Sequence, residues 1–503
     1  MRKIILVLTA FVLLMTMAFP TFASSSPELR MMGLEEGTRN WEDHLFFDRM
    51  EEKTGVRFEF VQYRDEAAYR EALSLLNPGD PRVPDVFFKA ALLPEEMISL
   101  YHQGVLLDLR PYLEENMPNF YALLKKDPAI LTAISLPNGE IVSLPFITEP
   151  AAQNILWINQ AWLDALGLDM PENAKELEQT LQSFKTGDPN RNGRQDEIPL
   201  SFSGPYDLKY LAHAFGLAAN DFNLFLQDDQ ARFMPLEKEF RLFIRWCRDL
   251  FKQGLLDPNG FTTVDALRRI TDENAANRLG AFFSPLPGNL VPFEWVSQYR
   301  AVPPLQFEGK SVYRTISGSA FNGAFALSTA CQNVSAALTW ADTLYSQEGA
   351  VLAGIGLVGE DYVFDGDGTW RLLRDPAQDE YLSRVAIADG HSAPGLSTDQ
   401  FQRLYADPMV RYLSDQVAAV ASVARDPFPV FPLSSAEREA IAPLQAALGR
   451  YVDESIARFV LGETEVTDEA FAAFEQELIT LGVHEFVALW QDAYRGRSFH
   501  DGV

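Results

Sequence analysis

The alternation of strand and helix patterns near the start of the chain constrains its fold more than any other feature. Residues 28–34, 56–61 and 85–88 have the apolar patterns of strands, and helical patterns at 41–54 and 66–76 separate them. Strands that alternate with helices in this way build a mostly parallel sheet with helices on its faces. The chain is therefore predicted to have an α/β fold.

The length predicts more than one packing unit. The chain has 503 residues, and a single hydrophobic core stops growing at roughly 250 to 300 residues. A second strand and helix pair, 323–327 and 333–345, resumes the first unit after an insertion that is helical in pattern from 162 to 278. A Pro-Asn-Gly turn within 136–144 predicts an edge hairpin, and residues 437–494 are helical in pattern.

Composition excludes several classes of partner. Asp and Glu number 70 against 42 Lys and Arg, while 36 Phe, 16 Tyr and 8 Trp supply material for a large core. Nucleic acid and anionic membrane surfaces attract clustered basic residues, so neither is an expected partner. The composition predicts a folded, acidic, soluble protein.

The first 26 residues have the pattern of a secretory signal. Arg2 and Lys3 precede an apolar run from 4 to 18, and small residues follow Thr21 and Phe22 at a cleavage point. We expect residues 1–23 to be removed, which takes the formal charge from -28 to -30 because two positive charges leave. The alternative is an uncleaved membrane anchor, for which the run is short. The cleavage site has no cysteine, so lipid attachment there is not expected. Cys247 and Cys331 are predicted to be free, buried thiols.

A loop at 188–199 has the sequence pattern of a calcium site. Oxygen-bearing side chains occupy positions 1, 3, 5, 9 and 10 of the loop, and a glycine occupies position 6. Ca²⁺ takes six to eight oxygen ligands, and alternate side chains of a tight loop converge on one point. Position 12 is Pro199 rather than the bidentate acid of an EF-hand. The alternative is a polar turn without metal. The predicted ligands of a structural Ca²⁺ are Asp188, Asn190, Asn192, the carbonyl of Arg194, Asp196 and Glu197.

Other motifs do not support catalysis or cofactor binding. Gly354, Gly356 and Gly359 match the spacing of a dinucleotide fingerprint, but a helical pattern precedes them and a strand pattern follows. Residues 365–368 are predicted to be a hairpin turn. The six histidines are scattered. Glycoside hydrolysis needs two facing carboxylates, a pair that a chain with 70 acids neither excludes nor supports.

Several segments resemble the family 1 extracellular solute-binding proteins of ABC importers, in particular the larger oligosaccharide-binding, lipoprotein-like branch. Their order and spacing carry the resemblance, which extends over most of the chain. The matching segments are 41–56, 84–88, 104–109, 155–168, 254–258, 341–350 and 451–462. The loop at 188–199 also resembles a structural Ca²⁺ site of that branch.

The resemblance implies a two-lobed periplasmic binding protein fold with hinge strands and an extended helical C-terminus. The implied N-terminal lobe combines 27–147 with 322–352, and the implied C-terminal lobe combines 148–321 with 353–503. Hinge strands are expected near 148–154, 321–324 and 352–359. Many relatives carry a lipid on a cysteine at the cleavage site, and this chain has no cysteine there, so a freely diffusing periplasmic protein is expected.

The resemblance also implies a ligand in the cleft between the lobes. Sugar rings stack on aromatic side chains, and their hydroxyls form hydrogen bonds with polar ones. The alternative for each aromatic residue is a place in the core, and we expect about a third of the candidates to touch ligand. The aromatic candidates are Trp41, Phe88, Tyr206, Phe283, Trp295 and Trp370. The polar candidates are Arg39, Asn40, Lys89, Glu149, Gln153 and Asn154.

Taken together, these patterns predict a non-catalytic, monomeric protein that captures a carbohydrate, most readily an oligosaccharide, and delivers it to the permease of an ABC importer. Two alternatives stay open. One is a binder or sensor of peptides or other solutes, and the other is an exported carbohydrate-active enzyme.

Overall fold

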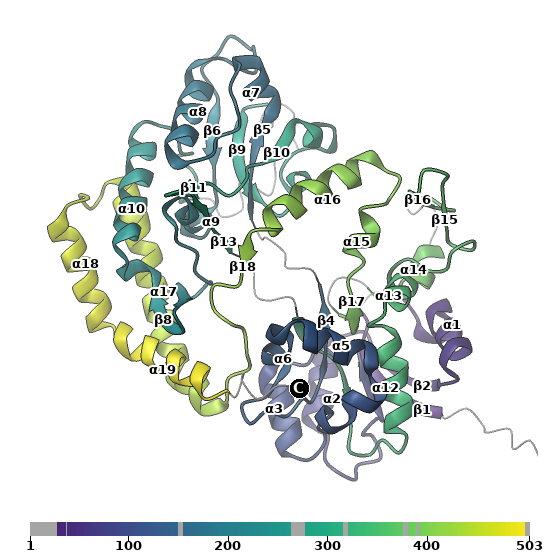
Figure 1. Ribbon diagram of the computed structural model, residues 1–503. Coiled ribbons are helices and arrows are strands. Elements are labelled where there is room, and N and C mark those ends of the chain that lie inside the picture. Colours follow the sequence, from purple (N-terminus) through teal and green to yellow (C-terminus); the bar gives the residue numbers. More distant parts are fainter. Residues whose placement is uncertain are drawn as a thin grey trace, which may run out of the picture.

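The computed structural model of the chain describes residues 28–36, 38–148, 154–262, 277–314, 320–375, 381–388 and 392–497. It contains one β-sheet of six strands and another of four, each surrounded by helices (Figure 1). We call the six-stranded sheet with its helices the first lobe and the four-stranded sheet with its helices the second lobe. The predicted signal segment, 1–23, lies outside the described residues. No helix within the described ranges is long and apolar enough to cross a bilayer.

The sheet of the first lobe has the strand order β17-β4-β14-β3-β1-β2. β1 is parallel to β2 and β3, β17 is parallel to β4, and β14 is antiparallel to β3 and β4. All strands except β14 therefore point in one direction. Their bounds are β1 Glu28–Leu34, β2 Arg57–Tyr63, β3 Val86–Phe88, β4 Leu144–Ile147, β14 Ala320–Leu327 and β17 Gly395–Leu396.

Helices cover both faces of this sheet, which explains the unbroken apolar sequence of β3. Successive side chains of a strand point to opposite faces, so Phe88 packs with Trp41 and Trp340 on one face, while Phe87 packs with Tyr69 on the other. The helices of this lobe are α1 Leu45–Thr54, α2 Glu66–Ser74, α3 Pro94–His102, α4 Leu113–Asn116, α5 Pro118–Lys126, α6 Pro128–Ile134, α12 Val334–Thr343, α13 Gln347–Gly354, α14 Tyr381–Val385 and α15 Asp399–Gln402.

The sheet of the second lobe has the order β10-β5-β9-β6, with β5 antiparallel to both neighbours and β6 parallel to β9. Trp157 on β5 and Phe184 on α8 lie fully buried in its core. The strands of the sheet are β5 Ile155–Asn159, β6 Ile198–Ser201, β9 Leu279–Ser284 and β10 Tyr299–Ala301. The helices are α7 Gln160–Leu166, α8 Ala174–Thr186, α9 Gly204–Tyr210, α10 Lys238–Lys252 and α16 Pro408–Ala421. Short strand pairs are β7 Leu224–Gln227 with β8 Gln230–Phe233, β11 Gln306–Phe307 with β12 Lys310–Ser311, and β13 Tyr313–Arg314 with β18 Ala424–Arg425.

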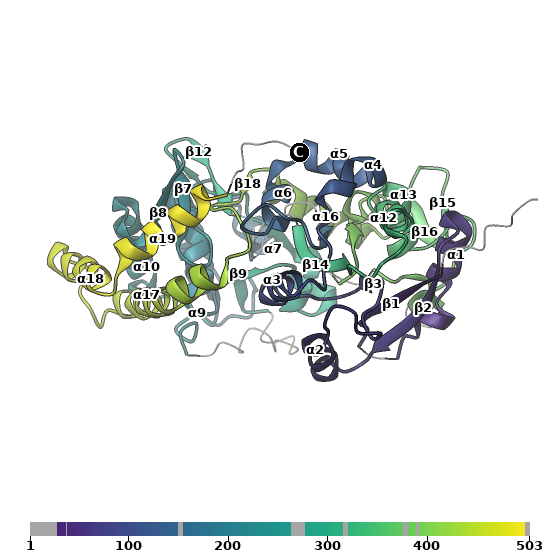
Figure 2. The same ribbon diagram turned by 90° about the horizontal axis from the view of Figure 1, so that it is seen from below.

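The C-terminal region is helical, as predicted, and belongs to the second lobe. It consists of α17 Ser435–Leu461, α18 Asp468–Thr480 and α19 Val483–Arg495. Ser434 and Glu437 form a capping box at the start of α17, and Gly462, with a φ of 82°, ends it. The three helices bury apolar side chains in the second core, at the end of the molecule away from β1 and β2 (Figure 2). Arg438 of α17 also pairs with Glu95 of α3 at 2.9 Å, which links the two lobes.

Three segments connect the lobes. The first joins β4 to β5, the second joins β13 to β14, and the third precedes α16, which packs on β10 through a hydrogen bond from the Tyr412 hydroxyl to the Tyr299 carbonyl. The predicted crossing at 352–359 is wrong, because Leu352 lies in the core of the first lobe and β17 pairs with β4 in its sheet. The predicted crossing at 321–324 falls within β14.

These contacts suggest different lobe boundaries. We propose that the first lobe consists of residues 28–147 and 320–406, and the second lobe of 155–314 and 408–497. The sequence pattern at 352–359 misled because the hairpin of β15 Tyr362–Phe364 and β16 Trp370–Leu372 interrupts the first lobe before its last strand.

Several smaller predictions can be compared with the structure. Residues 365–368 form the turn between β15 and β16, as predicted. Cys247 and Cys331 are buried and free, as predicted. The region 162–278 was predicted to be mainly helical and contains β6, β7 and β8 as well. Residues 136–144 form a turn, with the Leu136 amide bonded to the Glu140 carbonyl at 2.8 Å, but no strand precedes β4 there.

Two glycines give a test of the packing. A Cβ on Gly33 of β1 would lie 1.7 Å from the backbone oxygen of Phe88, whereas a Cβ on Gly449 of α17 would meet nothing within 4 Å. We expect Gly33→Ala to lower the free energy of unfolding by about 4 kcal/mol or more. We expect Gly449→Ala to raise it by about 0.5–1 kcal/mol, because glycine loses more backbone entropy in a helix. Denaturant titration of both variants checks this, and a harmless Gly33→Ala would contradict the packing of β1 on β3.

Candidate functional site

The carboxyl ends of the parallel strands in both lobes lie at the edges from which the connecting segments leave. In the first lobe β1, β2, β3 and β4 share one direction, and the chain leaves the end of β4 for the second lobe. In the second lobe Ile155, at the start of β5, pairs with Ser284, at the end of β9, and β6 ends beside β9. Open α/β sheets bind ligands at the carboxyl ends of their strands. Both edges are therefore the place to look for a site (Figure 1).

A buried charged cluster occupies this edge of the first lobe. Glu35, directly after β1, accepts a hydrogen bond from Lys89 Nζ at 2.6 Å, and both side chains are almost fully buried. Arg39 Nη1 lies 3.1 Å from the other carboxylate oxygen, and the Trp41 indole N–H donates to Glu35 at 3.2 Å. Lys89 has a φ of 48°, a left-handed conformation that is uncommon outside glycine. Three donors thus converge on one carboxylate.

The segment 381–388 lies over this cluster. The Ser383 carbonyl accepts from Arg39 Nε at 3.1 Å and lies 3.1 Å from His44 Nε2, and Ile387 is fully buried in the first core. Burial, helped by the positive charges of Arg39 and Lys89, lowers the pKa of His44 to about 4. The chain itself therefore fills the crevice above β1 and β3, and His44 is neutral at neutral pH.

The matching edge of the second lobe holds a second polar cluster. Asp207, near the start of α9, accepts from the Asn154 amide and from the Ser203 backbone N–H, each at 2.7 Å. Its side chain is 4 % exposed, and burial raises its pKa to about 7. Tyr206 and Tyr210 lie on the same helix with their hydroxyls 3.2 Å apart.

Arg314 packs across these tyrosines. Its guanidinium carbon lies 4.1 Å from the ring centre of Tyr210 and 5.5 Å from that of Tyr206. It also donates to the Tyr210 hydroxyl at 2.7 Å and to the Ala219 carbonyl at 2.8 Å. The result is a rigid wall of aromatic rings and hydrogen-bonding groups.

Aromatic side chains also lie on the 3-10 helix Phe293–Gln298, between β9 and β10. Phe293 is 70 % exposed, the highest value among the large hydrophobic side chains in the described part of the chain. Trp295, two residues later, is half-buried against the second core. An exposed Phe costs hydration free energy unless something covers it, so this segment is a candidate ligand surface. The sequence analysis missed Phe293, although its place between Pro292 and Glu294 in a non-periodic segment indicates a loop.

The structure places the predicted ligand residues in four groups. Arg39, Trp41, Phe88 and Lys89 meet in the first lobe, with Asn40 nearby, bonded to Asp43. Asn154 and Tyr206 lie in the second cluster, Phe283 lies buried beneath Tyr210, and Trp295 lies after β9. Trp370 is buried with Phe401 away from both clusters. Glu149 and Gln153 lie outside the described residues. Trp41, Phe88, Phe283 and Trp370 are almost fully buried here, and none offers a free ring face.

The loop at 188–199 is folded around its own side chains. The Asp188 carboxylate accepts from the backbone N–H groups of Asn192 and Gly193, and the Asn192 amide donates to Asp196 at 2.9 Å. This hydrogen bond from Asn192 lowers the pKa of Asp196. Within the described residues, no group of three or more His, Cys, Asp or Glu side chains is arranged to hold a metal ion.

Glu197 is the feature of this loop that fits a cation. Both of its carboxylate oxygens are buried and have no hydrogen-bond partner. Burial raises its pKa, and the negative charges of Asp188 and Asp196 add to the effect. A buried carboxylate without partners is costly unless a cation lies beside it. The Asn190 amide donates to the Asn277 carbonyl at 3.2 Å, which leaves its oxygen directed within the loop, toward the Asn192 N–H.

Known proteins resemble this chain over most of its length. No model of a protein family matches it. The fructooligosaccharide ABC transporter substrate-binding protein FusA of Streptococcus pneumoniae is 24% identical over 480 residues, which cover 90% of this chain and 87% of FusA. The chain is therefore similar over most of its length to a substrate-binding protein of an ABC transporter.

Solved structures of such proteins share the fold. An HMO binding ABC-transporter associated solute-binding protein of Bifidobacterium longum infantis matches with a TM-score of 0.71 at 20% identity, over 95% of this chain and 100% of that one. FusA in complex with kestose, and an EF-hand mutant of FusA in complex with fructo-nystose, each match with a TM-score of 0.63 at 21% identity, over 93% of this chain and 99% of theirs. The predicted two-lobed α/β fold is confirmed.

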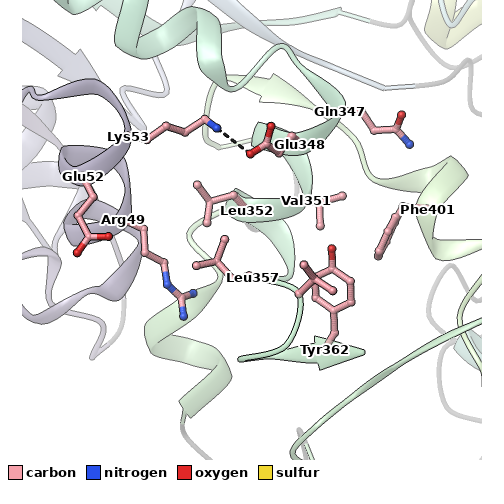
Figure 3. Close-up of a pocket in the computed structure, with 12 residues that line it drawn as sticks. Arg49, Glu52, Lys53, Gln347, Glu348, Val351, Leu352, Leu357, Tyr362 and Phe401 are labelled. Carbon is pink, nitrogen blue, oxygen red and sulfur yellow. Dashed lines mark hydrogen bonds and ion pairs between the residues drawn. The ribbon is translucent and has the colours of Figure 1, made fainter. Parts of the chain in front are cut away.

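A groove lies on the first lobe, beside α1 and α13. It has a volume of about 590 Å³ and is formed by α1, α13 and the region of β15, with Tyr362, Phe401 and Leu357 in its lining (Figure 3). Its charged rim is satisfied within the chain, because Lys53 pairs with Glu348 at 2.7 Å and Arg49 with Asp361 at 2.7 Å. We therefore place the candidate site at the strand edges.

The buried pair of Lys89 and Glu35 can be compared with an exposed pair of equal length. Lys89→Met leaves Glu35 buried with fewer donors, and we expect a loss of about 3 kcal/mol in the free energy of unfolding. Lys53→Met removes a surface pair at 2.7 Å and should cost less than about 1 kcal/mol. Denaturant titrations of both variants make the comparison. If both variants lost the same free energy of unfolding, burial would not explain how much the Lys89–Glu35 pair contributes to stability.

Proposed function

We propose that the chain is the substrate-binding component of an ABC importer, that it captures an oligosaccharide between its lobes, and that it delivers the sugar to a membrane permease. The observation that carries the proposal is the pair of strand edges from which the connecting segments leave, of which the second carries the aromatic rings of Tyr206 and Tyr210 beside hydrogen-bonding side chains. FusA, similar over 90% of this chain, supports the same function.

The chemistry of the second edge suits a sugar. Sugar rings present apolar C–H faces to aromatic rings and hydroxyls to amides, carboxylates and guanidinium groups. Asn154 and Tyr206 supply polar groups at this edge, and Phe293 and Trp295, between β9 and β10 of the same lobe, supply an exposed and a half-buried ring. Closure of the lobes would bury a ligand on both sides, so the bound state is favoured by its extra contacts.

Binding without catalysis is part of the proposal. The substrate-binding relatives are not enzymes, and the buried carboxyl of Asp207 is already engaged by Asn154 and Ser203. A peptide binder, a sensor and a carbohydrate-active enzyme are the competing functions that the first experiment separates.

We infer that the protein acts outside the cytoplasm as a monomer. The sequence pattern of residues 1–23 supports export, and the absence of cysteine at the predicted cleavage site favours a freely diffusing periplasmic form. A lipid anchor, as the name of the partly similar lipoprotein LipO of Bacillus subtilis suggests for that protein, is the alternative.

We also propose that the loop at 188–199 binds a structural Ca²⁺. Glu197, Asp188 and Asp196 would supply carboxylate oxygens, Asn190 and Asn192 amide oxygens, and Arg194 its carbonyl. The ion would be the positively charged partner of the Glu197 carboxylate, whose two oxygens are buried and have no hydrogen-bond partner. No nucleophile accompanies these groups, so the expected role is to stabilise the second lobe.

A thermal-shift screen of the mature chain tests the function. The panel contains mono- and oligosaccharides, including kestose, fructo-nystose and HMOs, with peptides as a separate set. A ligand at 100 times its Kd stabilises the folded state by about 2.7 kcal/mol and raises the unfolding midpoint. Phe293→Ala should weaken the best sugar about tenfold, because a stacking ring contributes roughly 1.4 kcal/mol.

Phe364→Ala is the matched control, because Phe364 is also exposed, at 51 %, but lies on β15 away from both edges. It should bind the sugar like the parent chain. A response to peptides alone would replace the sugar proposal, and formation of a cleaved product would favour an enzyme.

A calcium titration tests the loop. With Ca²⁺ present, a chelator should lower the unfolding midpoint of the parent chain. Glu197→Gln should abolish this response and, in chelator, should be more stable than the parent, because it removes a buried unpaired charge. Asp367→Asn, in the β15–β16 turn, should leave the response unchanged. A midpoint insensitive to both Ca²⁺ and chelator would show that the loop is a polar turn without metal.

A further inference from the structure

Two of the three segments that connect the lobes end beside each other in the second lobe. Asn154 ends the first segment, and Tyr313 and Arg314 of β13 begin the second. Ala424 and Arg425 of β18, beyond the third, pair with β13 in parallel register. The Tyr313 hydroxyl donates to the Asn154 carbonyl at 2.8 Å, which joins the first two segments directly.

Asp207 is the buried group beneath this junction. One carboxylate oxygen accepts from the Asn154 side-chain amide and the other from the Ser203 backbone N–H, each at 2.7 Å. Ser203 is the N-cap residue of α9, and its side chain makes no cap hydrogen bond. Asp207 therefore fixes the start of α9 and the end of the first connecting segment with a single side chain.

The backbone of Asn154 needs this support. Its φ is 49°, in the left-handed region that non-glycine residues enter at a cost of about 1 kcal/mol or more. A carbonyl bonded to Tyr313 and an amide bonded to Asp207 hold this conformation from two sides. Asn enters this region more readily than most non-glycine residues, and the two hydrogen bonds add to that preference.

The charged side chains near Asp207 form ion pairs with other residues and not with Asp207. Arg314 is engaged with Asp221, Tyr210 and Ala219, and Lys209 on α9 lies 3.1 Å from Asp453 on α17. His213 follows in the next turn of chain with its ring 4.9 Å from that of Tyr313, and burial lowers its pKa to about 4, so it is neutral at neutral pH. Asp207 is thus not neutralised by any of these groups, and its partners are neutral donors.

We propose that Asp207 is a positioning residue, which holds Asn154 against Tyr313 and so fixes the start of β5 relative to β13 at the edge where the second lobe would bind ligand. Its charged form accepts both hydrogen bonds at full strength. Its protonated form must either lose one of them or make the Asn154 amide turn over. How well Asn154 is held beside Tyr313 therefore depends on the charge of Asp207. The consequence of this dependence for ligand binding rests on the proposed function.

Two quantities are expected to depend on pH, in opposite directions: the global stability of the fold and the local order around Asn154. Because burial raises the pKa of Asp207 from 3.8 to about 7, the folded chain keeps a proton that the unfolded chain loses, and the stability contributed by this group falls as the pH rises from about 4 to 7. Local order at the junction changes the other way, because the charged form that holds Asn154 is populated only above about pH 7. A carboxyl with a merely structural role would not couple these two measurements.

Hydrogen–deuterium exchange of the ligand-free chain between pH 6 and 8.5 tests the proposal. After correction for the intrinsic pH dependence of exchange, peptides that contain Asn154 and Tyr313 should gain roughly tenfold protection across this range. Asp207→Asn should show the low protection at every pH and should lose its share of the decrease in unfolding midpoint between pH 5 and 7. Asp342→Asn is the matched control, because Asp342 is a buried carboxyl of equal exposure that binds the N–H groups of Asn119 and Phe120 in the first lobe.

Tyr313→Phe keeps the proposal testable if Asp207→Asn does not fold. It removes the hydroxyl bonded to Asn154 without touching Asp207, so protection should be lower at every pH while its pH dependence remains. Protection that does not change with pH in the parent chain, or that is the same in Asp207→Asn as in the parent chain, overturns the proposal. Because no sugar is present, this result is independent of whether the sugar screen finds a ligand.

Discussion

Burial of both faces of the first-lobe sheet is the constraint on which the rest of the structure depends. Strands such as β3 are apolar on both sides, so polar chemistry is confined to the strand ends. Five of the six strands share one direction, and their carboxyl ends therefore collect at one edge. The chain leaves for the second lobe from that same edge, which brings the polar ends of two sheets to the connecting segments. The location of the site follows from topology before any side chain is considered.

Sequence patterns predicted the architecture well because the patterns of the first lobe are local. The strands at 28–34 and 85–88 and the helical C-terminus needed only periodicity and length. The boundary at 352–359 was wrong for a non-local reason: β17 returns to pair with β4 after a 40-residue excursion through the β15–β16 hairpin, and two residues of strand leave almost no periodic signal. The order of such short, distant pairings is decided by tertiary contacts.

The residues of the candidate site also differ in whether the local sequence predicts them. Residues that directly follow strands, such as Lys89 and Asn154, were found because strand ends can be read from the sequence. Asp207 and Arg314 were missed, since one lies inside a short helix and the other before a connecting segment, and neither is distinguished by spacing. Burial also cannot be read from a residue type: Trp41 and Trp370 have the chemistry of sugar platforms, yet they fill cores, whereas Phe293 is the exposed ring. Which aromatic side chain faces solvent depends on how the two lobes pack.

The two edges also differ in what they leave free. In the first lobe the Glu35 and Lys89 pair is buried under residues 381–388. Its charges therefore stabilise the position of that segment of the chain and do not face a ligand. In the second lobe the polar groups lie on α9 and β13, against the connecting segments themselves. There β13 pairs with β18, and the Tyr313 hydroxyl is bonded to the Asn154 carbonyl, so the residues that flank two of the connecting segments are held together within the second lobe. The first edge is therefore covered by the chain's own segment, whereas the second edge has its polar groups beside the residues from which the chain crosses to the other lobe.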